Sequence, residues 1–129
     1  MSSIVKKMQS KPDFYAMKGV TEEQIKQAEK ALGLLFSDEY REYVAAFGIA
    51  SFDGHELTGI CAFPRLDVVS VTNEERNCNP TIPPNYYVVE QAHIDGIVVW
   101  QSSTGEVYQT MPNAPTIKLC ASLCEYLEL

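Results

Sequence analysis

The sequence has 129 residues, of which 46% are hydrophobic, and its formal net charge is −7. A chain of this length can bury one ordinary core but is too short for two comfortable domains, so we expect a single domain over residues 1–129. No apolar run approaches the roughly 18 residues of a membrane span, and no basic patch with interleaved aromatic residues favours direct binding of nucleic acid.

The first nineteen residues mix lysines with aromatic residues around Pro12. The start of the chain lacks the apolar run of about 7 to 15 residues that defines a signal peptide, so we expect a cytoplasmic protein without membrane contact. We predict that residues 1–19 form a partly mobile N-terminal extension. Within it, residues 13–17 are predicted to form a short helical turn that docks on the body of the protein.

Two amphipathic helices are predicted between residues 20 and 48. Thr21 and Gln24 stand at capping-box spacing, and apolar residues then recur at helical spacing until Gly33, which suits a left-handed cap. A second helix begins after Ser37 with two acidic residues, which a helix N-terminus favours, and ends at Gly48. The apolar faces of both helices must therefore meet a core.

The middle of the chain is less regular. Residues 52–56 have the residue types that are common in loops, and residues 57–63 are typical of a strand interrupted by Gly59. From residue 68 to 76 the pattern fits either a strand or a short helix, because propensity does not decide at this length. Residues 77–85 contain three prolines and predict a surface loop of adaptable shape.

Consecutive antiparallel strands are predicted next, with Asp95-Gly96 at the first turn and Gly105 supplying a positive φ at the second. A brief extended piece at residues 116–119 and a final helix from about Ala121 follow. The fold class is therefore α+β, a small and mostly antiparallel sheet with helices packed on one side. The predicted strands span residues 86–91, 97–101 and 106–110.

Three blocks of sequence, taken in order, resemble the SUKH superfamily over roughly residues 20 to 129. They are residues 21–48 with both predicted helices, the turn and strand at residues 103–108, and the closing residues 121–127. The resemblance implies an α+β fold. Many bacterial members of this superfamily are immunity proteins that bind and neutralise a cognate polymorphic toxin, often a nuclease, and related domains occur in fungal cell-wall regulators.

No assembled catalytic or metal site is visible in the sequence. A cysteine nucleophile with a histidine base could pair Cys61 with His55, or Cys78 with His93, but no local signature supports either pair. Cys120 and Cys124 are four apart without the second pair that a zinc site requires, and we expect reduced thiols in small buried side chains. We predict a protein that is not an enzyme and that has no catalytic residues, no metal and no cofactor.

Acidic residues concentrate in the middle of the chain, where residues 38 to 106 hold eleven acids and three bases. Such a surface suits a basic partner, since long-range attraction raises the association rate. Under the SUKH resemblance, we expect an immunity protein or antitoxin, a monomer or weak dimer, that occludes the basic active-site surface of a cognate toxin. The alternatives are a regulatory or scaffold domain that binds another cellular protein, and an unrecognised hydrolase.

The predicted interface residues fall into two groups. Six carboxylates lie in or beside predicted loops, and two tyrosines beside the proline-rich loop could act as desolvated anchors. The carboxylates are Asp53, Glu56, Glu74, Glu75, Glu90 and Asp95, and the tyrosines are Tyr86 and Tyr87. Asp53 and Glu56 could also offer oxygen ligands to a cation, although a calcium site needs several more.

Overall fold

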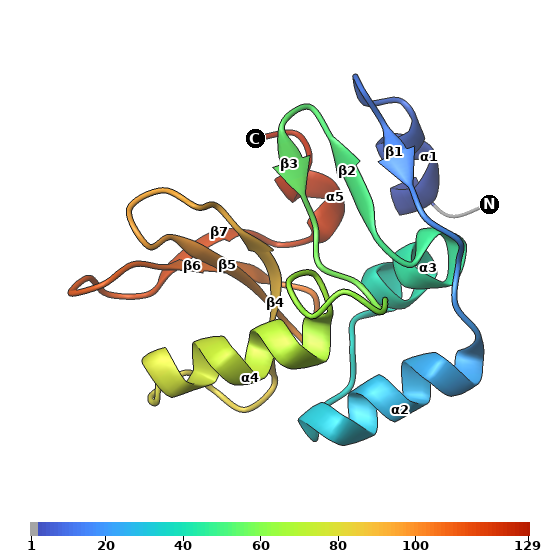
Figure 1. Ribbon diagram of the computed structural model, residues 1–129. Coiled ribbons are helices and arrows are strands. Elements are labelled where there is room, and N and C mark those ends of the chain that lie inside the picture. Colours follow the sequence, from blue (N-terminus) through green and yellow to red (C-terminus); the bar gives the residue numbers. More distant parts are fainter. Residues whose placement is uncertain (1–2) are drawn as a thin grey trace.

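The computed structural model describes residues 3–129, which form five helices and seven short strands (Figure 1). The predicted α+β class with small antiparallel sheets is confirmed. The helices are α1 (Ser3–Gln9), α2 (Glu22–Leu32), α3 (Asp38–Phe47), α4 (Val68–Cys78) and α5 (Leu123–Tyr126). The strands are β1 (Tyr15–Ala16), β2 (Ala50–Phe52), β3 (His55–Glu56), β4 (Tyr86–Gln91), β5 (Val98–Ser102), β6 (Val107–Thr110) and β7 (Ile117–Cys120).

Helices α2 and α3 begin and end where the sequence predicts. The Gln24 amide donates to Thr21 Oγ1 over 3.2 Å, and the Thr21 amide donates to Gln24 Oε1 over 2.9 Å, which completes the capping box of α2. Gly33 ends the helix with φ 71°. The Ser37 side chain accepts the Tyr40 amide at the start of α3, and Gly48 follows its last turn. Both caps satisfy backbone groups that the helix leaves unpaired.

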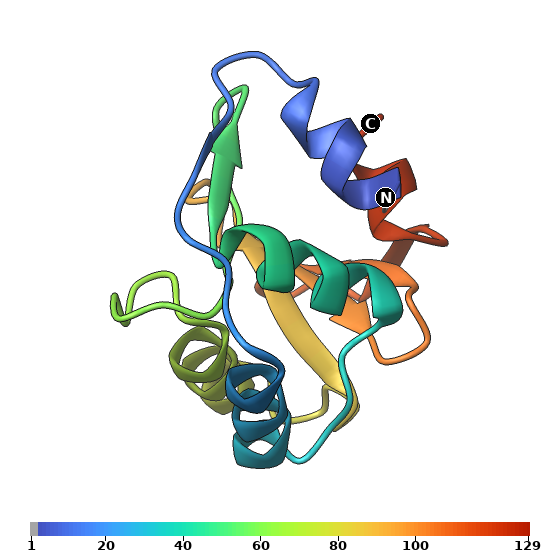
Figure 2. The ribbon, with the colours of Figure 1, turned by 90° about the vertical axis from the view of Figure 1, so that its right-hand side faces the viewer.

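The larger sheet has the strand order β4-β5-β6-β7, so the predicted run of consecutive strands is confirmed. Side chains alternate between its faces. Tyr87 and Val89 belong to the main core under the helices, whereas Val88 and Trp100 lie in a second, smaller cluster. Val71 of α4 covers that second cluster beside β4. Helix α4 therefore lies along one edge of the sheet, next to α2 (Figures 1 and 2).

The N-terminal segment is more ordered than the sequence analysis predicted. Helix α1 buries Ile4, Val5 and Met8 and lies beside α5 and α3 (Figure 2). The predicted helical turn at residues 13–17 is wrong, because this segment contains β1, which pairs with β2. The spacing of Ile4 and Met8, one helical turn apart, is the signal that predicts α1.

The segment after α3 also differs from the prediction. Residues 52–56 form the tight β2–β3 hairpin instead of an open loop, with positive φ at Asp53 and Gly54. The predicted strand at residues 57–63 is wrong, since only isolated bridges form there. Gly59 lies so close to Gly48 that an added Cβ would be 1.8 Å from the Gly48 carbonyl oxygen. This backbone contact, which only glycine permits, diverts the chain from a regular strand.

The alternative left open for residues 68–76 is settled as a helix. The Asp67 side chain accepts the Ser70 amide at the start of α4, and Val68, Val71 and Thr72 are buried on one side of the helix. Thr72 Oγ1 in turn accepts the Val88 amide over 3.0 Å, so α4 satisfies the outer edge of β4. An edge strand otherwise exposes such amides to pairing with other chains.

Candidate functional site

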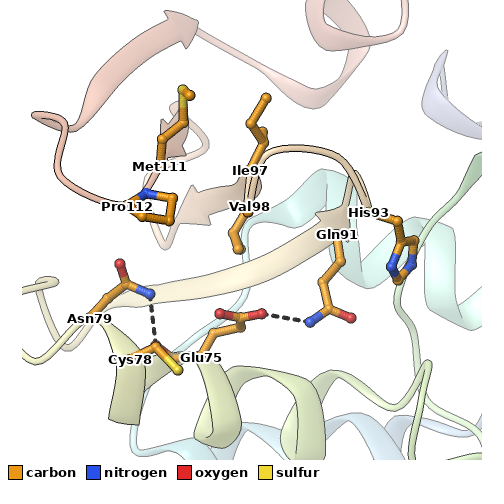
Figure 3. Close-up of a pocket in the computed structure, with 10 residues that line it drawn as sticks. Glu75, Cys78, Asn79, Gln91, His93, Ile97, Val98, Met111 and Pro112 are labelled. Atoms are coloured by element: carbon orange, nitrogen blue, oxygen red, sulfur yellow. Dashed lines mark hydrogen bonds between the residues drawn. The ribbon is translucent and has the colours of Figure 1, made fainter.

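A groove of about 460 Å³ lies between the C-terminal half of α4 and the loop that joins β4 to β5. We call it the α4 groove, and Figure 3 shows its lining residues converging from α4, from both ends of the β4–β5 loop and from the end of β6. The volume falls in the range of ligand-binding clefts. Its lining residues are Glu75, Cys78, Asn79, Gln91, His93, Gly96, Ile97, Val98, Met111 and Pro112.

One wall of the α4 groove is apolar and is fixed by an unusual backbone. His93, Asp95 and Gly96 all have positive φ, which bends the β4–β5 loop sharply. An added Cβ at Gly96 would lie 2.8 Å from Pro112 Cγ, so a glycine is needed for the loop to reach this wall. The loop is held against Pro112 and does not extend freely into solvent. The apolar wall consists of Ile97, Val98, Met111 and Pro112.

The opposite wall is polar and internally hydrogen bonded. Gln91 Nε2 donates to Glu75 Oε2 over 2.6 Å and thereby joins β4 to α4. Asn79 Nδ2 donates to the carbonyl oxygen of Glu75 over 2.9 Å. Both bonds hold polar side chains at the groove in fixed positions, as Figure 3 shows. The α4 groove therefore has a preformed polar wall facing a preformed apolar one.

The lining of the groove contains one carboxylate and neither lysine nor arginine. Arg76, although it neighbours Glu75 in sequence, donates to the carbonyl oxygens of Leu32 and Pro84 and so points away. The local charge at the polar wall is therefore negative when Glu75 is ionised. A cation docked there would be attracted without competition from a lysine or arginine of the lining.

Three of the predicted interface carboxylates are associated with this groove. Glu75 lines it, Glu74 is its exposed neighbour on α4, and Asp95 is exposed in the loop directly before Gly96. The sequence analysis placed Glu74 and Glu75 beside a loop, whereas the structure places them within the helix. Their adjacent positions on a helix direct the two side chains differently, and only Glu75 reaches the lining.

The β2–β3 hairpin carries two further predicted residues, both exposed. Asp53 occupies the turn, and Glu56 pairs with Arg65 through two hydrogen bonds of 2.9 and 3.1 Å. The hydrogen bonds from Arg65 lower the pKa of Glu56. The charge of Glu56 is therefore neutralised by Arg65, so Glu56 does not offer a free carboxylate to a partner.

Tyr87 is not at the surface, so the reason for choosing it as an anchor is wrong. Its side chain is fully buried in the main core, where Phe36 and Tyr40 pack against the ring. Its hydroxyl accepts the Ser37 amide over 3.0 Å and donates to Gln101 Oε1 over 2.7 Å. Tyr87 thus anchors α3 to the sheet. Tyr86, half-buried, stacks on Tyr108 with ring centroids 4.7 Å apart.

Glu90 is likewise buried, with 5% of its surface exposed, and does not lie at a loop. The β-bulge at Val89 shifts the register, so that Glu90 pairs opposite Val99 and its side chain turns toward the core face. There the carboxylate accepts the Tyr126 hydroxyl over 2.5 Å and lies 2.9 Å from His55 Nδ1. This cluster, which the sequence does not reveal, ties the two sheets to α5.

Neither cysteine–histidine pair considered in the sequence analysis is hydrogen bonded within residues 3–129. Cys78 and His93 line the same groove, but no hydrogen bond joins them, and His55 bonds to Glu90 instead of Cys61. In the part of the chain described, no group of three or more histidine, cysteine or acidic side chains could hold a metal ion. All four cysteines are free.

Among residues 3–129, no helix has the length and apolar character that crossing a membrane requires.

Comparison with known proteins places the chain in a family. The comparison with curated proteins finds no significant match. The family model SUKH_5, described as SMI1-KNR4 cell-wall, matches residues 1–114. This match covers most of the chain and agrees with the α+β fold, so the protein belongs to the SUKH superfamily.

Proposed function

We propose that this protein is an immunity protein that binds a cognate toxin and neutralises it stoichiometrically. Membership of the SUKH superfamily fits such a role in general, and the family is generally non-catalytic. The partner would be a toxin whose active site is basic, as in an enzyme that cuts nucleic acid. Carboxylates placed over the phosphate-binding residues of the toxin would then deny that surface to its substrate.

The observation that carries the proposal is the α4 groove. It combines an apolar wall with a negative polar wall, and exposed carboxylates of Glu74 and Asp95 lie beside it. Protein interfaces typically place an apolar centre inside a polar rim. An exposed apolar side chain, Ile94, at 61% exposure, extends the apolar surface from the same loop. A basic partner that binds there would therefore bury apolar surface and be attracted by negative charge at the same place.

Preorganisation favours this groove over the flexible loops that the sequence analysis emphasised. The two hydrogen bonds of Gln91 and Asn79 and the contact of Gly96 with Pro112 hold both walls before a partner arrives. A surface that is already ordered loses little conformational entropy on binding, so more of the contact energy becomes affinity.

The proposal is tested with the product of a toxin gene adjacent to the gene of this protein. Co-expression should rescue growth of cells that produce the toxin, and the purified pair should form a 1:1 complex in light-scattering measurements. A toxin that is neutralised without complex formation, or a neighbouring toxin that this protein neither binds nor neutralises, would contradict the proposal.

The second candidate is a regulatory or scaffold domain that binds a cellular protein other than a toxin. The description of the matching family, SMI1-KNR4 cell-wall, is the observation that favours it. Deletion of the gene separates the two candidates. Loss of a regulator should alter growth or the cell envelope in the absence of any toxin, whereas loss of an immunity protein should harm only cells exposed to the toxin.

A further inference from the structure

The polar wall of the α4 groove has a definite hydrogen-bonding polarity. Gln91 Nε2 donates to a carboxylate oxygen of Glu75, and Asn79 Nδ2 donates to the Glu75 main-chain carbonyl oxygen. The main-chain carbonyl oxygen of Glu75 can only accept hydrogen bonds, and the same holds for its side chain in the carboxylate form. The amide groups of Gln91 and Asn79 are therefore fixed with nitrogen toward Glu75, and neither can flip without losing its bond.

The remaining atoms of these three side chains are acceptors. The fixed amides direct the carbonyl oxygens Oε1 of Gln91 and Oδ1 of Asn79 away from their bonds to Glu75. Glu75 Oε1 accepts no hydrogen bond within residues 3–129, and Figure 3 shows it on the side of the carboxylate opposite to Gln91. Each amide nitrogen uses one of its two N–H groups in these bonds, whereas Glu75 Oε1, Gln91 Oε1 and Asn79 Oδ1 accept no hydrogen bond within residues 3–129 and remain available as acceptors.

We infer that the α4 groove receives an arginine side chain presented by the partner. This inference rests on the proposed function, namely that the protein acts by binding another protein. A guanidinium group has five N–H donors and no acceptor, which complements a wall of acceptors. Its positive charge matches the Glu75 carboxylate, and no lysine or arginine of the lining opposes it.

The apolar wall accounts for the rest of the arginine side chain. Arginine buries its methylene stem against apolar surface while its charged end bonds to polar groups. Ile97, Val98, Met111 and Pro112 also line the groove and provide such a surface, and Figure 3 shows the Val98 side chain directed toward Glu75. Lysine has a similar stem, but its compact ammonium is more strongly hydrated and lacks the planar fork that spreads over several acceptors. The geometry therefore points to arginine over lysine.

The direct test uses the peptide acetyl-Leu-Arg-Leu-amide as the probe and the full chain labelled with ¹⁵N. Titration should shift the side-chain amide signals of Gln91 and Asn79 in NMR spectra in a saturable way. The same peptide with citrulline in place of arginine is the matched control, because it keeps the shape while losing the charge. Equal binding of the citrulline peptide or of a lysine peptide would overturn the inference.

Glu75→Gln is the decisive variant. The new side chain can still accept the Gln91 amide through its carbonyl oxygen, but it places an N–H₂ donor where wild type offers a free acceptor. Losing the charge-assisted bond should weaken arginine-peptide binding by about tenfold or more. The control is Glu23→Gln, which makes the same change in charge at an exposed position on α2, away from the groove lining.

The two variants keep the inference falsifiable whether or not a toxin is found. Thermal melts and NMR spectra establish that both variants fold. Equal peptide affinity of Glu75→Gln and Glu23→Gln would contradict the arginine site while leaving the immunity function intact. Selective loss in Glu75→Gln, together with no protection against the neighbouring toxin, would support the arginine site and contradict the immunity function.

Discussion

Replacing Tyr87 with phenylalanine should destabilise the protein without affecting partner binding. The change removes a hydroxyl that accepts the Ser37 amide and donates to Gln101 Oε1 in the main core. Gln101 Oε1 still accepts the Ser37 hydroxyl over 3.1 Å, but the Ser37 amide loses its partner. Leaving one buried donor unpaired costs about 1–3 kcal/mol of unfolding free energy. At about 4 °C per kcal/mol for a chain of this size, Tm should fall by about 4–12 °C.

The assay is thermal and urea unfolding followed by circular dichroism, with Tyr15→Phe as the control. Tyr15 is 62% exposed, so the same chemical change there should alter the unfolding free energy by less than about 0.5 kcal/mol. An unchanged Tm in Tyr87→Phe would refute the account of Tyr87 as a buried link between α3 and the sheet. If Tyr87→Phe remains fully folded but binds the partner more weakly, Tyr87 contributes to the interface after all, as the sequence analysis predicted.

Three further outcomes follow from the caps, the surface pair and the thiols. Thr21→Ala should lower the unfolding free energy by about 1 kcal/mol in urea melts, because α2 loses its N-cap acceptor, whereas Thr21→Ser should retain it. The pKa of Glu56 is lowered by Arg65, so the pair stabilises the fold above the ordinary carboxyl pKa of 4.5, and that contribution is lost as pH falls through the folded pKa. Arg65→Met should therefore lower Tm slightly at neutral pH and leave it unchanged in strong acid; a difference that persists there would contradict this assignment. Burial and the nearby Glu39 carboxylate raise the pKa of Cys124 to about 11, so about one thiol in a thousand is ionised at pH 8. Iodoacetamide should then label exposed Cys78 well before Cys124 in peptide mass spectra, and equal labelling would show that Cys124 is not protected.

Helices α2 and α3 and the larger sheet could be predicted because their signals are local. The capping residues Thr21 and Ser37, the terminal Gly33 and the turn at Gly105 act within a few residues of their own position. The β2–β3 hairpin was equally local, since Asp53-Gly54 is a favourable hairpin dipeptide, but too few strand residues flank it to give a pattern. The path of residues 57–63 could not be predicted, because it depends on the contact of Gly59 with Gly48 across the fold.

The candidate site was predicted only in part, because its geometry comes from tertiary contacts. Acidic composition indicated Glu75 and Asp95, yet nothing in the sequence joins Glu75 to Gln91 or Gly96 to Pro112. Glu90 was chosen because it lies beside a predicted turn, but the bulge at Val89 turns its side chain toward the core. Whether a carboxylate near a turn is exposed or buried depends on the pairing register of the strand that carries it.

The most direct test of the account is the binding of the neighbouring toxin to wild type and to the double variant Glu74→Lys, Glu75→Lys, measured by surface plasmon resonance at low and high salt. The account predicts that wild type associates rapidly, that salt slows its association by screening, and that the double variant binds more weakly and protects cells less. Binding and protection that are the same for both proteins, with a rate independent of salt, would contradict the claim that the α4 groove meets a basic partner.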